Sequence, residues 1–271
     1  DADEADYAIA FAIPMNTPGL KIICRDLYAE HADPERHPLT ARFDEVDAAL
    51  VFDDVLVPWE RVFVYKNPQL LAGIMYIHTW AQYSTMLRLL IKLEGFLGVA
   101  QLLTEYGGRN KSASSQILLS TLMQDIEILR SCIQVAEAKG YVSPGGTCAP
   151  RLSAAYRVYS IQASDRAERT MEGLLTSTLM LSGGASDLNS DVGPLVERYF
   201  RGGAPSTKEH LRLMAIAADM VMTPFGKRSQ LYERLQSGEV DRMRQRLYTQ
   251  YQDPIPAERM REFISRMERE R

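Results

Sequence analysis

The pattern of hydrophobic and polar positions changes near residue 66. Before this point, apolar residues come in short runs that are rich in β-branched and aromatic side chains and are separated by turn-forming residues. After it, apolar residues recur every three or four positions over long stretches, which is typical of helices that bury one face. We therefore predict an α+β fold, with a partial middle β-domain over residues 1–66 and a helical bundle with a helical tail over residues 67–271.

The segment from residue 43 to residue 65 contains this change of pattern. Its two short apolar runs, residues 49–52 and 55–57, are separated by Asp53-Asp54, a pair that is typical of turns. We predict that the two runs form a β-hairpin. Pro58 should end the ladder, because proline has no N–H group to donate.

Two further strands are expected upstream, over residues 7–13 and 20–25. Between them, Asn16-Thr17-Pro18-Gly19 has the composition of a tight turn. The polar stretch over residues 26–38 contains two prolines and two histidines and is long enough to form a mobile lid. A sheet built from these strands alone would have long unpaired edges, so we expect a further part of the β-domain to precede residue 1.

Three long helices are expected in the second part of the chain. The first starts near residue 67 and stops at Gly107-Gly108, the second covers about residues 112–139, and the third covers residues 152–180. Helices of this length joined by short loops favour an antiparallel up-and-down bundle. The tail, residues 240–271, alternates in charge and carries apolar residues at helical spacing, which predicts a solvent-facing or subunit-bridging arm.

Composition narrows the classes of function. A chain of 271 residues with 46% hydrophobic residues can bury a substantial core. The net charge of −4 and the absence of a basic stripe disfavour nucleic acid and anionic lipid as partners. The 3 cysteines are far apart and form no Cys-x-x-Cys pair, so no metal site is predicted and reduced cytoplasmic thiols are the simplest interpretation. We find no apolar run of the roughly 18–20 residues that a membrane span requires.

Several separated motifs resemble one enzyme family. The segment VFDDVLVP at residues 51–58, followed by Val62, resembles the strand pair that leads into the helical bundle of the acyl-CoA dehydrogenase superfamily. Residues 43–65 as a whole, MLRLLIKLE at residues 86–94 and TPFGKRSQLYER at residues 223–234 are similar to the oxygenase component of the 4-hydroxyphenylacetate 3-hydroxylase family. The motifs occur in the family's order and span nearly the full chain.

The resemblance implies a two-component flavin-dependent monooxygenase. In such a system a separate flavin reductase supplies FADH2, O2 forms a C4a-hydroperoxide on the flavin, and a small phenolic or aromatic substrate is hydroxylated beside its hydroxyl group. The protein has to hold the ring and the flavin together and exclude water. The resemblance also implies a homotetramer, built as a dimer of dimers, and a β-barrel or sandwich in the middle domain. The residues that activate the phenol are expected upstream of Asp1, so no catalytic residue is assigned.

The same resemblance assigns candidate substrate contacts. Asn16 and Thr17 follow the FAIP strand, at the turn where the family holds the polar end of its substrate, and residues 25–31 correspond to a loop that closes over the ring. Without the resemblance, the simpler interpretation is that Asn16 and Thr17 only form the turn. Asn16 is larger than the hydroxyl residues expected there, which leaves the identity of the aromatic substrate open.

Two glycine-containing turns are candidate contacts for FAD. Gly183 and Gly184 stand where the superfamily has a turn that lets the backbone approach the adenosine diphosphate half of the flavin, often across a subunit interface. The segment Phe225-Gly226-Lys227-Arg228 precedes a predicted helix and offers N–H groups and positive charge to a pyrophosphate. An ordinary helix cap and a surface basic pair are the alternatives for the two turns.

One basic pair on the first long helix has two interpretations. Arg88 and Lys92 are four residues apart and therefore lie on one helix face. They are candidates for binding an anion, but a solvated helix face is the more common arrangement.

Three other functions remain as alternatives. An acyl-CoA dehydrogenase would need a glutamate base after the glycine turn, where this chain reads Tyr199-Phe200-Arg201-Gly202-Gly203. A 4-hydroxybutyryl-CoA dehydratase would need an iron–sulfur cluster, yet residues 76–106 contain His78 and no cysteine. A non-catalytic oligomerisation module would retain no flavin.

Overall fold

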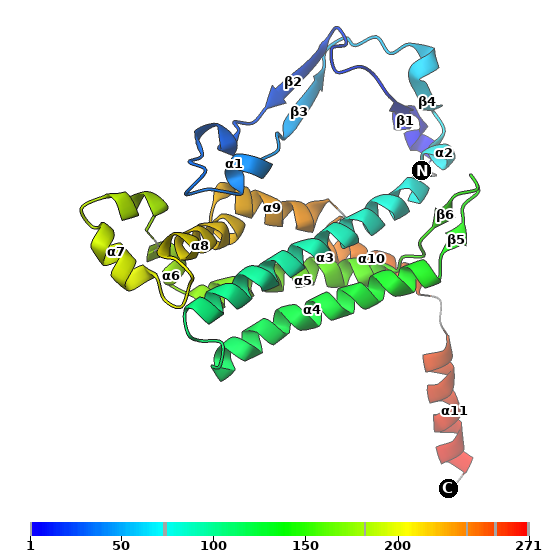
Figure 1. Ribbon diagram of the computed structural model, residues 1–271. Coiled ribbons are helices and arrows are strands. Elements are labelled where there is room, and N and C mark those ends of the chain that lie inside the picture. The colour runs from blue at the N-terminus through cyan, green and yellow to red at the C-terminus, as the bar shows by residue number, and fades with distance from the viewer. Residues whose placement is uncertain (1, 73–74, 182, 237, 252–253, 270–271) are drawn as a thin grey trace.

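The computed structural model describes residues 2–72, 75–181, 183–236, 238–251 and 254–269. It is mostly helical, with small antiparallel sheets (Figure 1). Strands β1 to β4 all precede residue 66, and the long helices all follow it. Among the described residues, no helix is long and apolar enough to cross a membrane.

The N-terminal part contains two separate two-stranded sheets. Strand β1 (Ile9–Phe11) pairs with β4 (Val62–Tyr65), and β2 (Leu20–Cys24) pairs with β3 (Ala48–Phe52). A short helix, α1 (Thr40–Phe43), lies on the connection between β2 and β3. The barrel or sandwich expected here remains a prediction, because the described strands of residues 9–65 form these two ladders alone.

The predicted hairpin between residues 49–52 and 55–57 is wrong. Strand β3 pairs with β2, with Ile22 opposite Leu50, and residues 55–57 belong to no strand. Asp53 donates its backbone N–H to the carbonyl of Gly19, and Asp54 has a positive φ of 54°. The turn residues therefore direct the chain away from β3, and the next strand, β4, returns to β1.

Three long antiparallel helices form the body of the second part: α3 (Met75–Tyr106), α4 (Ala113–Ala138) and α5 (Ala154–Leu175). Each buries an apolar stripe against the other two, which accounts for the spacing seen in the sequence. The shared core contains Met86, Leu89, Leu93, Phe96, Leu122, Leu129, Ala163, Ala167 and Met171. A short helix, α2 (Pro68–Ala72), precedes α3.

The third helix is shorter than predicted. Helix α5 ends at Leu175 because Thr176 takes a left-handed φ of 49°, and the chain resumes as α6 (Thr178–Leu181). The first helix was predicted to start near residue 67, but α3 starts at Met75, after the separate helix α2. Its C-terminal end and both ends of the second helix agree with the prediction. Gly108 follows α3 with a φ of 67°, and Ser112 and Lys139 flank α4.

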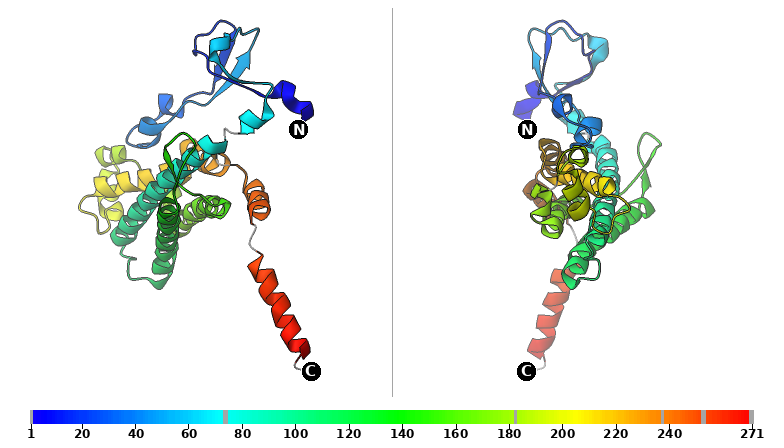
Figure 2. Two further views of the ribbon diagram at one scale, coloured as in Figure 1. Left: turned by 90° about the vertical axis from the view of Figure 1, so that its right-hand side faces the viewer. Right: turned by 60° about the vertical axis from the view of Figure 1, so that its left-hand side comes forward.

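Shorter helices complete the structure: α7 (Gly193–Phe200), α8 (Thr207–Val221), α9 (Pro224–Leu235), α10 (Val240–Gln250) and α11 (Ile255–Arg269). A two-stranded ladder, β5 (Tyr141–Val142) with β6 (Cys148–Ala149), joins α4 to α5. Helix α10 packs on α5, whereas α11 projects away from the bundle (Figures 1 and 2). Its apolar side chains Met260, Phe263 and Ile264 are exposed.

Candidate functional site

A buried carboxylate joins the N-terminal part to the bundle. Asp219 on α8 is fully buried and accepts hydrogen bonds from the backbone N–H groups of Leu39 and Thr40, each at 2.7 Å. The hydroxyls of Thr40 and Thr223 donate to its other oxygen at 2.5 and 2.9 Å. Asp219 therefore fixes the start of α1 against the corner between α8 and α9.

A chain of ion pairs reinforces this junction. Arg228 on α9 donates to both carboxylate oxygens of Asp47, at 2.8 and 2.5 Å, and also pairs with Glu45. Arg25, at the end of β2, donates to the same carboxylate at 3.0 Å and to Asp44 at 2.6 Å. The guanidinium of Arg228, followed by that of Arg25, holds the pKa of Asp47 well below its usual range.

A pocket of about 640 Å³ lies at this junction. Its walls come from α1 and the residue before it, from α3, from the end of α8 and from the first two turns of α9. They are mainly apolar: Leu39, Phe43, Ile91, Phe96, Met220 and Phe225. The polar groups that line it are Arg88, Lys92 and Ser229. We call it the junction pocket. An apolar cleft between two parts of a chain with a few convergent polar groups is the usual form of a small-molecule site.

The charged side of the junction pocket continues into the bundle. Arg88 donates to the buried carboxylate of Glu233 at 3.0 Å, and the ammonium of Lys92 lies 3.6 Å from the same carboxylate. Lys92 also donates to the hydroxyl of Ser229 at 2.8 Å. Burial lowers the pKa of Lys92 because the charged form is desolvated, although Glu233 opposes the shift.

Behind this pair lies an arginine whose charge has no hydrogen-bonded partner among the described residues. Arg157 on α5 is 1% exposed, and none of its three guanidinium nitrogens is hydrogen-bonded. Burial lowers its pKa to about 10. The amide nitrogen of Gln230, on the facing side of α9, also lacks an acceptor, while its oxygen accepts from Ser164 at 2.9 Å.

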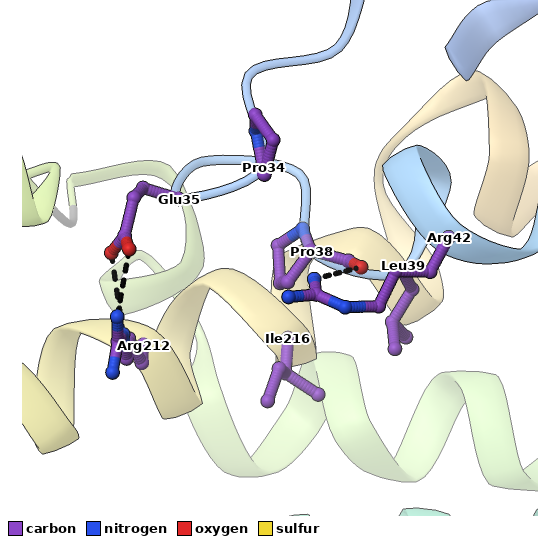
Figure 3. Close-up of a pocket in the computed structure, with 7 residues that line it drawn as sticks. All are labelled: Pro34, Glu35, Pro38, Leu39, Arg42, Arg212 and Ile216. Carbon is purple, nitrogen blue, oxygen red and sulfur yellow. Dashed lines mark hydrogen bonds and ion pairs between the residues drawn. The ribbon is translucent and has the colours of Figure 1, made fainter.

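A second pocket, of about 360 Å³, separates residues 34–42, which comprise a loop and the start of α1, from α8 (Figure 3). Glu35 reaches across it to Arg212, whose nitrogens donate at 2.7 and 3.2 Å. Arg42 turns back and donates to the carbonyl of Pro38 at 2.8 Å. The polar groups around this pocket thus bind one another, and the loop is held to α8 by an exposed ion pair.

The two predicted substrate residues are not among the residues that line the junction pocket. Asn16 is exposed, and the Thr17 hydroxyl donates to the carbonyl of Pro14 at 2.6 Å within the turn that ends at Gly19. The turn is the loop between β1 and β2, at the end of the sheets away from the bundle (Figure 1). Their role as substrate contacts stays a prediction.

The predicted cofactor residues fall into two places. Phe225 and Gly226 line the junction pocket, while Arg228 binds Asp47 beside it and Lys227 pairs with Glu168 and Glu172 on α5. Gly226 lies in the first turn of α9, where its N–H donates to the Thr223 hydroxyl, the helix cap, at 3.2 Å. A Cβ at this position would lie 2.6 Å from the carbonyl oxygen of Asp219, so only glycine permits this contact between α8 and α9.

Gly183 and Gly184 lie beyond α6 and are not among the residues that line the junction pocket. The Gly184 N–H donates to the Asp187 carboxylate at 2.8 Å, and Arg36 from the loop before α1 lies beside it. As predicted binding residues they remain untested. The side chain of His78, which the sequence raised as a possible cluster ligand, lies outside the described residues. Among the described residues, no group of three or more His, Cys, Asp or Glu side chains is placed to hold a metal ion.

The sequence alone did not identify several residues of the site. Leu39 and Phe43 enter the pocket from α1, a helix that the periodicity did not predict, and Asp219 looks like any acidic residue of an amphipathic helix. Arg157 stands in a stretch rich in small residues, a weak signal of close packing around a large side chain. Arg88 and Lys92 were recognised by their spacing but not distinguished from a solvated face.

Family models match nearly the whole chain. The model described as 4-hydroxyphenylacetate 3-hydroxylase C terminal matches residues 70–265, and the corresponding N terminal model matches residues 1–64. The chain belongs to the 4-hydroxyphenylacetate 3-hydroxylase family. A relative from Thermus thermophilus, the oxygenase component of 4-hydroxyphenylacetate 3-monooxygenase, is 34% identical over 97% of this chain and 56% of its own length. The oxygenase component of a Rhodococcus 4-nitrophenol 2-monooxygenase is 30% identical over 91% of this chain and 50% of its own length.

The structure resembles solved structures of the same family and one of a more distant protein with the same fold. A crystal structure of a 4-hydroxyphenylacetate 3-monooxygenase oxygenase component complexed with FAD and 4-hydroxyphenylacetate has a TM-score of 0.88 and 33% identity, over 98% of this chain and 57% of that one. An archaeal 4-hydroxybutyryl-CoA dehydratase has a TM-score of 0.85 at 14% identity, over 98% of this chain and 54% of that one, which shows the fold alone. This member of the hydroxylase family therefore spans about half the length of the relatives that it matches.

Proposed function

We propose that the protein containing this chain is the oxygenase component of a two-component flavin monooxygenase that hydroxylates a phenolic substrate. Membership of the family supports the reaction class. The junction pocket is the structural observation that carries the proposal, because it lies between the two parts of the chain and includes two residues that the sequence had assigned to the cofactor.

The residues of the junction pocket fit a flavin. Its apolar walls suit a planar aromatic ring, and Arg88, Lys92 and the Ser229 hydroxyl supply polar and positively charged groups at one side. Phe225 and Gly226 would contact the cofactor, with Lys227 and Arg228 on the same helical turn, while Gly183 and Gly184 would contact it from another subunit. Reduced FAD, when bound, supplies the activation of O2.

The chain's own residues would position the ligand and exclude water. Leu39 and Phe43 close one side of the junction pocket, and the hydrogen bonds of Asp219 hold them there. Water exclusion matters in this chemistry because an activated oxygen species is lost when water reaches it. Asn16 and Thr17 would contact the polar end of the aromatic substrate, and the phenol-activating residues would come from the part that the relatives have in addition.

The partners follow from the same proposal. A separate reductase would supply reduced FAD, and the full assembly would be a homotetramer. The exposed apolar side chains of α11 support contacts between subunits, since an amphipathic helix that projects from its own chain has an apolar face left to cover.

The test uses the whole protein that contains this chain, mixed anaerobically with chemically reduced FAD and then with oxygen and 4-hydroxyphenylacetate. We expect reduced FAD to bind and the phenol to be converted to its ortho-hydroxylated product. Absence of measurable binding of reduced FAD would show that the assignment is wrong. Flavin binding with no conversion of any phenol would refute the proposed reaction.

A further inference from the structure

Where α3, α5 and α9 meet, two cations contact one buried carboxylate and a third has no such contact. Arg88 and Lys92 contact Glu233. Arg157, buried on α5, hydrogen-bonds to none of the described residues, and the charge of Glu233 only partly offsets the lowering of its pKa by burial. The count is three positive charges against one negative charge. The other buried carboxylate nearby, Glu168, is already paired with Lys227 and Arg234.

This charge imbalance is located where water is scarce. Arg157 is 1% exposed and Glu233 is 4% exposed, so their charges interact in a medium far less polar than water. Buried guanidinium groups almost always have hydrogen-bond acceptors, yet among the described residues none accepts from the three nitrogens of Arg157 or from the amide nitrogen of Gln230. Four buried nitrogen atoms are thus left without an acceptor there, and Arg88, Lys92 and Arg157 exceed the charge of Glu233 by two.

Part of this positively charged cluster is exposed to solvent in the junction pocket. Arg88 and Lys92 form the boundary between the buried cluster and the pocket, with side chains that are 42% and 19% exposed. The Ser229 hydroxyl accepts a hydrogen bond from Lys92, so its own proton is available to a further acceptor. A negatively charged acceptor would be attracted by the positive charges and would accept a hydrogen bond from the Ser229 hydroxyl, so all of these groups would strengthen its binding.

We propose that the junction pocket binds an anionic group of its ligand, a phosphate or a carboxylate, at Arg88, Lys92 and Ser229, with Arg157 behind them as an uncompensated positive charge. This deepens the proposed function, because a flavin nucleotide would supply phosphates and an aromatic acid would supply a carboxylate. The apolar side of the same pocket would then contact the uncharged part of that ligand.

The test measures thermal unfolding of the whole protein that contains this chain with increasing inorganic pyrophosphate or phenylacetate, with KCl added to keep the ionic strength constant. We expect one of the two anions to raise the unfolding temperature in a saturable way, and the anion that does so identifies the source of the negative charge. If neither anion has an effect beyond that of KCl, the proposal is wrong.

Three variants show whether the effect comes from this cluster. Lys92→Met should weaken the anion's affinity at least tenfold, which corresponds to about 1.4 kcal/mol. Arg157→Met should weaken it several-fold although Arg157 does not line the pocket. Arg130→Met is the control, since Arg130 on α4 also pairs with a carboxylate, that of Glu94, and does not line the junction pocket. Equal affinities in the wild type, Lys92→Met and Arg157→Met would refute the proposal.

Failure of the anion-binding proposal can be distinguished from failure of the proposed function. Saturable anion binding without any binding of reduced FAD would leave the anion site standing and reject the flavin enzyme. Binding of reduced FAD with no response to either anion would reject the anion site and leave the enzyme assignment intact.

Discussion

Replacing Asp219 with asparagine tests whether this carboxylate holds the N-terminal part on the bundle. The aspartate accepts four hydrogen bonds, two from backbone N–H groups and two from hydroxyls, and is fully buried. In Asp219→Asn the amide oxygen can still accept from the two backbone groups. The hydroxyls of Thr40 and Thr223 can rotate to accept from the new NH2 group.

The cost of this change is therefore the loss of charge rather than the loss of contacts. Hydrogen bonds to a charged acceptor contribute about 1.5–3 kcal/mol each, against about 1 kcal/mol for neutral pairs. With partial compensation by the hydroxyls, we expect the docking of α1 (Thr40–Phe43) to weaken by about 2 kcal/mol. Asp219→Ala leaves two buried N–H groups without acceptors and should cost about 3–6 kcal/mol.

Hydrogen exchange measured by mass spectrometry locates the effect. A weakening of about 2 kcal/mol should accelerate exchange at Leu39 and Thr40 roughly 30-fold, while α4 (Ala113–Ala138) keeps its protection. Asp53→Asn is the control, because Asp53 pairs with Lys21 at the surface with 62% of its side chain exposed. Unchanged exchange in Asp219→Asn, or equal acceleration throughout α4, would refute the reasoning.

Three other changes give predictions of different sign. Arg157→Met should stabilise the protein by about 1–3 kcal/mol in urea unfolding, because it removes a buried charge that hydrogen-bonds to none of the described residues, and a loss of stability would contradict this. Gly226→Ala should destabilise the protein by about 1–3 kcal/mol, because its Cβ would lie 2.6 Å from a backbone oxygen. Gly98→Ala, whose Cβ would have no atom within 4 Å, should stabilise it by up to about 1 kcal/mol. Similar urea unfolding midpoints for the two variants would contradict this. Asp47 has a lowered pKa, so its contribution to stability is present above the ordinary aspartate value of about 3.9 and is lost as pH falls through the lower pKa of the folded state. The difference in stability between wild type and Asp47→Asn should therefore shrink below about pH 4 in acid titrations, and a difference that grows there would contradict it.

The helical half of the fold was predictable because its determinants are local. Apolar spacing and terminal glycines located both ends of α4 and the C-terminal end of α3 to within a few residues, but not the start of α3, which is Met75. Serine or threonine caps precede α5, α8 and α9. Composition located β1, β2 and β3, but it missed β4 and predicted a strand over residues 55–57 that does not form. It did not predict which strands pair. Residues 49–52 pair with β2 rather than with residues 55–57, because strand pairing depends on which segments the tertiary fold brings together.

The sequence by itself determined the family, the order of strands before helices and the segment around Phe225 and Gly226. These features depend on local propensity, or on motifs that can be recognised without coordinates. Only the tertiary structure decided which side chains share the junction pocket, that Asp219 holds α1 against the bundle, and that Arg157 lies buried with no hydrogen-bond partner in the part of the chain that the structure describes. Burial and charge pairing depend on contacts between segments more than a hundred residues apart, and no local pattern in the sequence records them.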